Sequence, residues 1–180
     1  MKNHLESLIE GCRRHDPRAQ RGLYDFLAPS MLSLCQRYMK DREVAKDVLQ
    51  DGFVTLFEKI STYKSEGSFE GWARKIFVNT ALMQLRRNDA LKFSDNIEDS
   101  QAMQMVQSNT LEKIGADEIY KLVSAMPDGF RTVFNLYVIE GYSHEEIADM
   151  LSITEGGSRS QLSRARAWLQ NKIKTNDKYD

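Results

Sequence analysis

The segment 68–87 carries an aromatic ring, an amide and cations along one side of a single amphipathic stretch. The members of this row are spaced three or four residues apart, which places them on one helix face: Trp72, Lys75, Asn79, Leu82 and Arg86. An aromatic ring stacks on an unpaired base, an amide can hydrogen-bond such a base, and cations neutralise phosphates. The row therefore suits single-stranded nucleic acid. Composition equally allows a second interpretation, in which Trp72 belongs to the core and the cations are only solvated.

A second signature of nucleic-acid binding lies near the C-terminus, where Ser143 and Glu146 have the spacing of a capping box. The helix that it begins is expected over 143–151, and a basic helix over 156–174 follows a short turn. Helix, tight turn and basic helix within about thirty residues is the helix-turn-helix pattern. Ser152 departs from it, because many such turns have glycine there to allow a left-handed backbone. A helical hairpin with a solvated basic face is the alternative.

Helical geometry divides the last of these helices into two faces. The core face is predicted to hold Leu162, Ala165, Leu169 and Ile173. The opposite face is predicted to hold Ser160, Ser163, Arg164, Ala167 and Asn171, with Arg159 at its edge. Short hydroxyl side chains let a backbone approach DNA, and arginine reaches phosphates or guanine edges. Arg166 is expected nearer the core-facing side.

The elements that position these residues are all predicted to be helical. We expect an all-α fold of two small helical domains, 1–88 and 117–180, joined by a flexible linker over 89–116 that is polar and poor in aromatic residues. Asp41 is predicted to cap a helix that runs to about residue 60. Pro29 is predicted to lie in the first turn of another helix.

Net charge is −1, but the charges are segregated along the chain. Residues 152–174 carry five Lys or Arg against one Glu, whereas 41–58 carry five acids against two bases. Such a chain can offer DNA one local surface and present an acidic helix to another partner. It should bind free DNA weakly by itself, because phosphate neutralisation dominates non-specific affinity.

Several classes of site are not expected. Cys12 and Cys35 lie on apolar helical faces and are interpreted as small buried hydrophobes. The three histidines show no ligand spacing with them, so neither a metal site nor a cofactor is predicted. No apolar run approaches the roughly 20 residues of a membrane-spanning helix, so no membrane insertion is expected. Without a visible signal peptide, the expected location is the cytoplasm.

Three segments, in this order and at this spacing, resemble the extracytoplasmic-function (ECF) sigma factors, the smallest members of the sigma-70 family. Residues 41–57 resemble the acidic helix that docks on the clamp of RNA polymerase. Residues 68–87 resemble the element that opens and reads the −10 region, and 126–172 resemble the domain that reads the −35 element. The resemblance covers nearly the whole chain.

The resemblance also implies roles for individual residues. It implies that Asp47, Gln50 and Asp51 contact the clamp helices of core RNA polymerase. It implies that Asn79 holds a flipped base of the non-template strand together with a loop that comprises Lys64, Ser65, Glu66, Gly67 and Ser68. It implies that the −35 element meets Arg159, Ser160, Ser163 and Arg164. The loop 155–158 before the recognition helix lacks the threonine usual after its first glycine, so the resemblance does not carry the family's base preference over to it.

The expected function is a sigma factor that binds core RNA polymerase and directs initiation at promoters with −35 and −10 elements. Its expected partners are the core polymerase, promoter DNA (duplex at −35, single-stranded at −10) and an anti-sigma factor. A stand-alone helix-turn-helix regulator that binds duplex DNA as a dimer is the rival, but it leaves the acidic helix and the Trp72 row unexplained. An enzyme is not expected, since no nucleophile–base constellation, phosphate loop or metal spacing is found.

Overall fold

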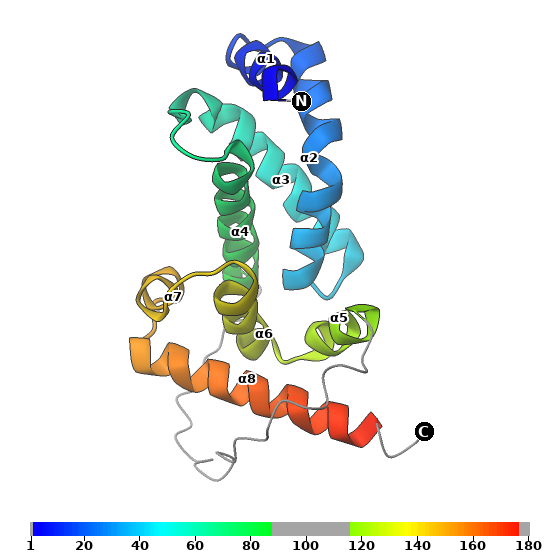
Figure 1. The fold of residues 1–180 in the computed structure, drawn as a ribbon, viewed down its shortest axis with the longest axis vertical. Helices are drawn as coiled ribbons and strands as arrows, with labels where there is room; N and C mark the ends of the chain where they lie inside the picture. The colour runs from blue at the N-terminus through cyan, green and yellow to red at the C-terminus, as the bar shows by residue number, and fades with distance from the viewer. Residues whose placement is uncertain (1, 88–115, 177–180) are drawn as a thin grey trace. The chain divides into compact units, whose positions relative to one another are not determined.

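The computed structural model describes residues 2–87 and 116–176, and every regular element in these ranges is a helix (Figure 1). The all-α prediction is thereby confirmed for the described ranges. The chain divides into two compact units, Met1–Arg87 and Asn88–Asp180, which are described separately. The predicted linker 89–116 lies outside the described residues except for its last position. The proposed domain boundaries therefore stay predictions.

The first unit consists of four α-helices and one short 3₁₀ turn. Helix α2 packs against α1, α3 and α4, and α3 also packs against α4. The elements are α1 (Lys2–Arg13), α2 (Pro17–Tyr38), α3 (Arg42–Lys59), η1 (Ile60–Thr62) and α4 (Phe69–Arg87). The Asp41 carboxylate accepts hydrogen bonds from the N–H groups of Glu43 and Val44, at 2.7 and 3.1 Å. The predicted N-cap of this helix is thus confirmed.

Pro29 does not begin a helix, contrary to the sequence prediction. Helix α2 passes through it without interruption from Pro17, which occupies the first turn, and Asp16 caps that end. A proline inside a helix removes one hydrogen bond and costs about 3 kcal/mol. Apolar residues on both sides of Pro29 are fully buried, among them Leu27 and Met31. Their burial outweighs the cost of the proline and keeps the helix continuous.

Close contact between α3 and α4 depends on a glycine. A Cβ atom at Gly52 would lie 2.4 Å from the ring of Phe77, so any side chain there would displace that ring. Phe77 is fully buried and packs edge-on against Phe53, with ring centroids 5.1 Å apart. Cys12 and Cys35 are also buried, and burial raises the pKa of their thiols to about 11 and about 12. Both cysteines therefore act as small hydrophobes, as predicted.

The second unit packs three helices onto a long C-terminal one. Helices α6 and α7 contact α8 most extensively, and α5 contacts it as well. The elements are α5 (Ala116–Ala125), α6 (Asp128–Phe134), the π-helical turn η3 (Asn135–Ile139), α7 (His144–Leu151) and α8 (Glu155–Asn176). Val123, Met126 and Ala165 form the centre of a core onto which Trp168 and Leu169 pack.

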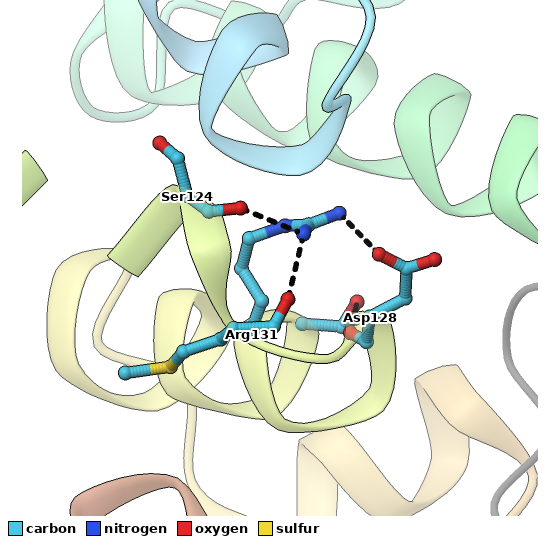
Figure 2. A network of polar contacts seen from close by, with 5 residues as sticks. Ser124, Asp128 and Arg131 are labelled. Carbon is cyan, nitrogen blue, oxygen red and sulfur yellow. Dashed lines mark hydrogen bonds and ion pairs between the residues drawn. The ribbon is translucent and has the colours of Figure 1, made fainter. Parts of the chain in front are cut away.

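A buried arginine joins the end of α5 to the start of α6 (Figure 2). The Arg131 side chain is 2% exposed, and its Nη2 pairs with the Asp128 carboxylate at 2.7 Å. Its Nη1 donates to the carbonyl oxygens of Ser124 and Met126, at 3.2 and 3.0 Å. The guanidinium therefore satisfies backbone carbonyls at a helix end that has no further turn to use them. Sequence analysis did not identify this residue.

Replacing Arg131 with Ala should destabilise the second unit by about 3 kcal/mol, because buried carbonyls and a carboxylate lose their donor. The chain has two tryptophans, Trp72 in the first unit and Trp168 in the second. In a Trp72→Phe background, urea unfolding followed by Trp168 fluorescence measures the second unit alone. A change below about 0.5 kcal/mol, the usual range for surface substitutions, would contradict a structural role for this network.

Candidate nucleic-acid interface

The acidic helix α3 turns the residues implicated in polymerase binding toward solvent. Asp47, Gln50 and Asp51 are all exposed. They lie within little more than one helical turn, so they share one face. Val54 continues that face and is 57% exposed, which is high for a large apolar side chain. The opposite side of α3 is buried against α2 and α4. The face is therefore polar and acidic with one exposed apolar side chain, so electrostatic complementarity would favour a basic partner surface.

The predicted arrangement of the row on α4 is confirmed in part, because some of its members share an exposed face. Lys75, Asn79 and Arg86 are exposed. Leu82 is 2% exposed and does not belong to the row, whereas Met83 is 53% exposed and takes its place. The buried side of α4 therefore extends further round the helix than the residue spacing indicates.

The environment of Trp72 agrees in part with each of the two interpretations that the sequence allows, base stacking and core packing. Its ring is half-buried and packs against those of Tyr63 and Phe69, with centroids 5.4 Å apart in both cases. Tyr63 and Phe69 are themselves in edge contact at 5.0 Å. The indole is therefore partly a core residue, and only its remaining surface is available for stacking.

The loop between η1 and α4 has a well-defined, strained backbone. Ser65 has φ of 60° and Gly67 has φ of 85°, both in the left-handed region, which is unusual for a serine. The Tyr63 hydroxyl donates to the Gly67 carbonyl oxygen at 2.9 Å and closes the loop. The predicted residues from Lys64 to Ser68 are all exposed. Asn79 lies eleven residues beyond Ser68, about 16 Å along the helix axis, so the loop and Asn79 are separate contact points.

A hollow of about 690 Å³ lies between this loop and α1. Its polar lining comes from Ser65, Gly67 and Ser68 in the loop and from Glu6, Glu10 and Arg13 in α1. Sequence analysis assigned no role to α1. The loop and α1 are about fifty positions apart in the chain, and no periodic pattern in the sequence indicates that they lie side by side.

The helix-turn-helix is confirmed in detail. Ser143 and Glu146 form the predicted capping box at the start of α7. Ser152 ends α7 in the left-handed conformation, with φ of 56°, at the position where glycine is common. Thr154 precedes α8, and its hydroxyl accepts the N–H of Gly157 at 2.9 Å. A hydroxyl group therefore stabilises the first turn of α8, although the usual threonine is missing from 155–158.

A polar contact joins the beginnings of α7 and α8. Nδ1 of His144 lies 2.9 Å from the hydroxyl oxygen of Ser158, which is fully buried. The imidazole also stacks on the Tyr137 ring, with centroids 4.4 Å apart. Partial burial lowers the pKa of His144, and the nearby Arg159 lowers it further. The contact between His144 and Ser158 therefore favours the neutral imidazole of His144.

The two faces of α8 agree with the helical count except at Arg164, Arg166 and Ala167: Ala167 is half-buried although it is predicted on the outward face, whereas Asn171 is exposed as predicted. Leu162, Ala165 and Ile173 are buried and Leu169 packs onto the core, as predicted. Arg159, Ser160 and Ser163 are exposed, and Arg159 forms an ion pair with Glu155. Arg166 is also exposed, whereas Arg164 is half-buried, so the expectation that Arg166 lies nearer the core is wrong. The outward face of the helix is therefore Arg159, Ser160, Ser163 and Arg166.

Within residues 2–87 and 116–176, no group of three or more His, Cys, Asp or Glu side chains is arranged to hold a metal ion. In the same part of the chain, none of the helices is long and apolar enough to span a membrane.

Family profiles match both units. The profile of Sigma-70 region 2 matches residues 23–91, and that of Sigma-70, region 4 matches residues 116–169. Together they cover about two thirds of the chain. The chain belongs to the sigma-70 family. As a sigma factor, it is a DNA-binding transcription initiation factor and not an enzyme.

Curated relatives of this sigma factor point to its ECF group. It is 27% identical to the ECF RNA polymerase sigma-E factor of Haemophilus influenzae, with 93% of this chain and 94% of the relative covered. It is 25% identical to the protein of the same name in Escherichia coli, with 92% of each chain covered. The resemblance to ECF sigma factors that the sequence suggested is thereby confirmed.

Solved structures show the same fold. The sigma factor RpoE from Bartonella quintana, solved in complex with the anti-sigma factor NepR, aligns with a TM-score of 0.54 at 19% identity. The alignment covers 86% of this chain and 96% of that one. CnrH, solved in complex with the cytosolic domain of CnrY, aligns with a TM-score of 0.52 at 19% identity, over 96% of this chain and 98% of that one.

The contact between His144 and Ser158 should make the stability of region 4 depend on pH. Because the folded pKa lies below the unfolded value of about 6.5, the stabilisation is complete above that value and is lost as pH falls through the folded pKa. The charged groups that act on His144 are Arg159, Glu155 and Arg166. Urea unfolding followed by Trp168 fluorescence in the Trp72→Phe background should therefore give a lower free energy at pH 5.5 than at 7.5. His144→Gln should lose less on acidification; an equal loss would show that other groups titrate.

Proposed function

We propose that three outward helix faces divide the work of promoter recognition in this sigma factor. The α3 face at Asp47, Gln50 and Asp51 binds core RNA polymerase. The row on α4 and the loop Lys64–Ser68 bind the unpaired −10 strand, and α8 reads the −35 duplex. The observation that carries the proposal is that each face is exposed, chemically distinct and placed in the matching family region.

The −10 contacts are proposed to follow the strand along α4. Lys75 and Arg86 neutralise phosphates, and the amide of Asn79 hydrogen-bonds a base that has left its stack. The loop engages a base at another position of the strand, since it lies about 16 Å from Asn79. Stacking on the remaining surface of Trp72 would contribute roughly 1–3 kcal/mol per base and favour strand opening.

The −35 contacts are proposed to come from the outward face of α8. Ser160 and Ser163 let the helix approach the duplex, and Arg159 reaches a phosphate or a base edge once its ion pair with Glu155 opens. Arg164, at the edge of this face, is still proposed to contact the −35 element. Arg166 is added to the proposed −35 contacts because it is exposed.

The two regions act together only on the polymerase. Core enzyme holds them at a fixed separation, so that two weak affinities combine through effective concentration. We further propose a cytoplasmic location, where core polymerase and promoter DNA are found. An anti-sigma factor is a proposed regulator, as such a complex exists for RpoE, a sigma factor of the same fold.

Reversing the charge of the α3 face should weaken core binding. Asp47→Lys combined with Asp51→Lys should lower affinity for core polymerase at least about thirtyfold, since one desolvated charged contact contributes about 2 kcal/mol. Glu6→Lys with Glu70→Lys is the control, because it changes the net charge equally at exposed positions elsewhere in the unit. The measurement is titration of labelled core enzyme without DNA. Equal losses in both double variants would remove this face from the interface.

Replacing Asn79 with Ala should impair strand opening and spare core binding and closed-complex formation. Permanganate footprinting measures unpaired thymines, and a template with a pre-melted −10 bubble provides the control because its base pairs are already broken. The defect should shrink on that template. A defect confined to duplex binding, with normal permanganate reactivity relative to occupancy, would refute the role of Asn79 in base capture.

A further inference from the structure

Arg13, the last residue of α1, lines the hollow beside the loop Lys64–Ser68. Nη2 of Arg13 donates a hydrogen bond to the backbone carbonyl oxygen of Tyr63 at 2.5 Å. Nη1 of the same guanidinium pairs with the Glu10 carboxylate, one turn earlier in α1, at 3.2 Å. The carboxylate fixes the orientation of the guanidinium, and the guanidinium in turn holds the start of the loop.

Tyr63 connects Arg13 to the rest of the loop. Its side chain is 8% exposed and is held by ring contacts with Phe69 and Trp72. Its hydroxyl donates to the Gly67 carbonyl oxygen at 2.9 Å. Tyr63 is therefore fixed at its backbone by Arg13 and at its side chain by α4, and it binds the far end of the loop.

The loop needs such a restraint because its backbone is strained. A non-glycine residue with positive φ persists only where surrounding contacts impose it, and Ser65 has φ of 60° between the two points that Tyr63 fixes. A second, shallow hollow lined by Arg13, Lys64 and Ser65 among others lies on the surface beside this part of the loop. The hydrogen bonds of Arg13 and of the Tyr63 hydroxyl therefore act together with the ring contacts of Tyr63 to hold the loop in its shape.

We propose that Arg13 is a positioning residue for −10 recognition, which presets the conformation of the loop Lys64–Ser68 and so sets its choice of base. This inference rests on the proposed role of the loop. A preformed loop binds its base without a further loss of conformational entropy, whereas a loose loop accepts several bases with similar affinity. The expected effect of losing Arg13 is therefore on discrimination more than on overall activity.

The first test concerns the loop itself. Hydrogen exchange of full-length protein, read by mass spectrometry on peptides that span the loop, should be faster in Arg13→Ala than in the wild type. Arg14→Ala is the matched control, because Arg14 is an exposed arginine on the neighbouring residue. It should leave loop exchange unchanged. Equal exchange in the wild type and in Arg13→Ala would show that Arg13 does not order the loop.

The second test concerns base choice. Holoenzymes are assayed by transcription from a promoter library randomised across the −10 element, with transcripts sequenced. Lys64→Ala combined with Glu66→Ala identifies the position that the loop reads. Arg13→Ala should lower the preference for the favoured base at that same position about three- to tenfold, the effect of one or two lost hydrogen bonds, and leave other positions unchanged. Tyr63→Phe, which removes the bond to Gly67, should act at the same position, and Arg14→Ala should not.

The outcomes distinguish a failure of the inference about Arg13 from a failure of the proposed role of the loop. If the loop double variant alters base preference and Arg13→Ala does not, the positioning role of Arg13 is refuted while the loop remains a reader. If Arg13→Ala weakens all sequences equally, Arg13 is a phosphate contact or a stability determinant and the proposal is wrong. If the loop double variant alters no preference, the loop does not read the −10 element, and the proposed role of the loop and the inference about Arg13 both fail.

Discussion

The close approach of α3 and α4 at Gly52 and Phe77 is the constraint on which the N-terminal half of this sigma factor depends. A Cβ atom at Gly52 would lie 2.4 Å from the Phe77 ring, so this setting of the two helices, with the Phe77 ring against the α3 backbone, requires glycine there. That setting turns the acidic face of α3 and the row on α4 outward, since each lies away from the shared contact. This buried contact therefore helps to set which side chains of α3 and α4 face solvent, among them those proposed to bind the polymerase and the opened strand.

Buried polar contacts have the corresponding role in the C-terminal half. Arg131 satisfies carbonyl groups between α5 and α6, and the pair of His144 and Ser158 joins α7 to α8. Such contacts specify geometry because a buried polar group that loses its partner is costly. They hold α8 so that its basic, serine-containing face stays exposed. If α8 reads the −35 duplex as proposed, that recognition depends also on these buried residues.

Features that depend on neighbours in the sequence could be predicted, whereas features that depend on distant packing could not. The caps at Asp41 and Ser143 follow from local hydrogen bonding and were predicted correctly. Pro29 was misplaced because the burial of α2 on both sides of it has no local signature. Leu82 and Arg166 were assigned to the wrong faces because a helical count does not show how far neighbouring helices extend around α4 and α8. The contact between Arg13 and Tyr63 spans fifty residues and leaves no periodic pattern.

The central claim is that the proposed −10-binding and −35-binding regions act together on one polymerase. Transcription by a reconstituted holoenzyme tests this claim most directly. Purified chain and core RNA polymerase would be supplied with a promoter library randomised over the region upstream of a fixed start site. The account predicts enrichment of two sequence blocks at one fixed spacing, and no enrichment without the core enzyme. Enrichment of a single palindromic block bound by the chain alone would contradict it and would identify a dimeric duplex-binding regulator instead.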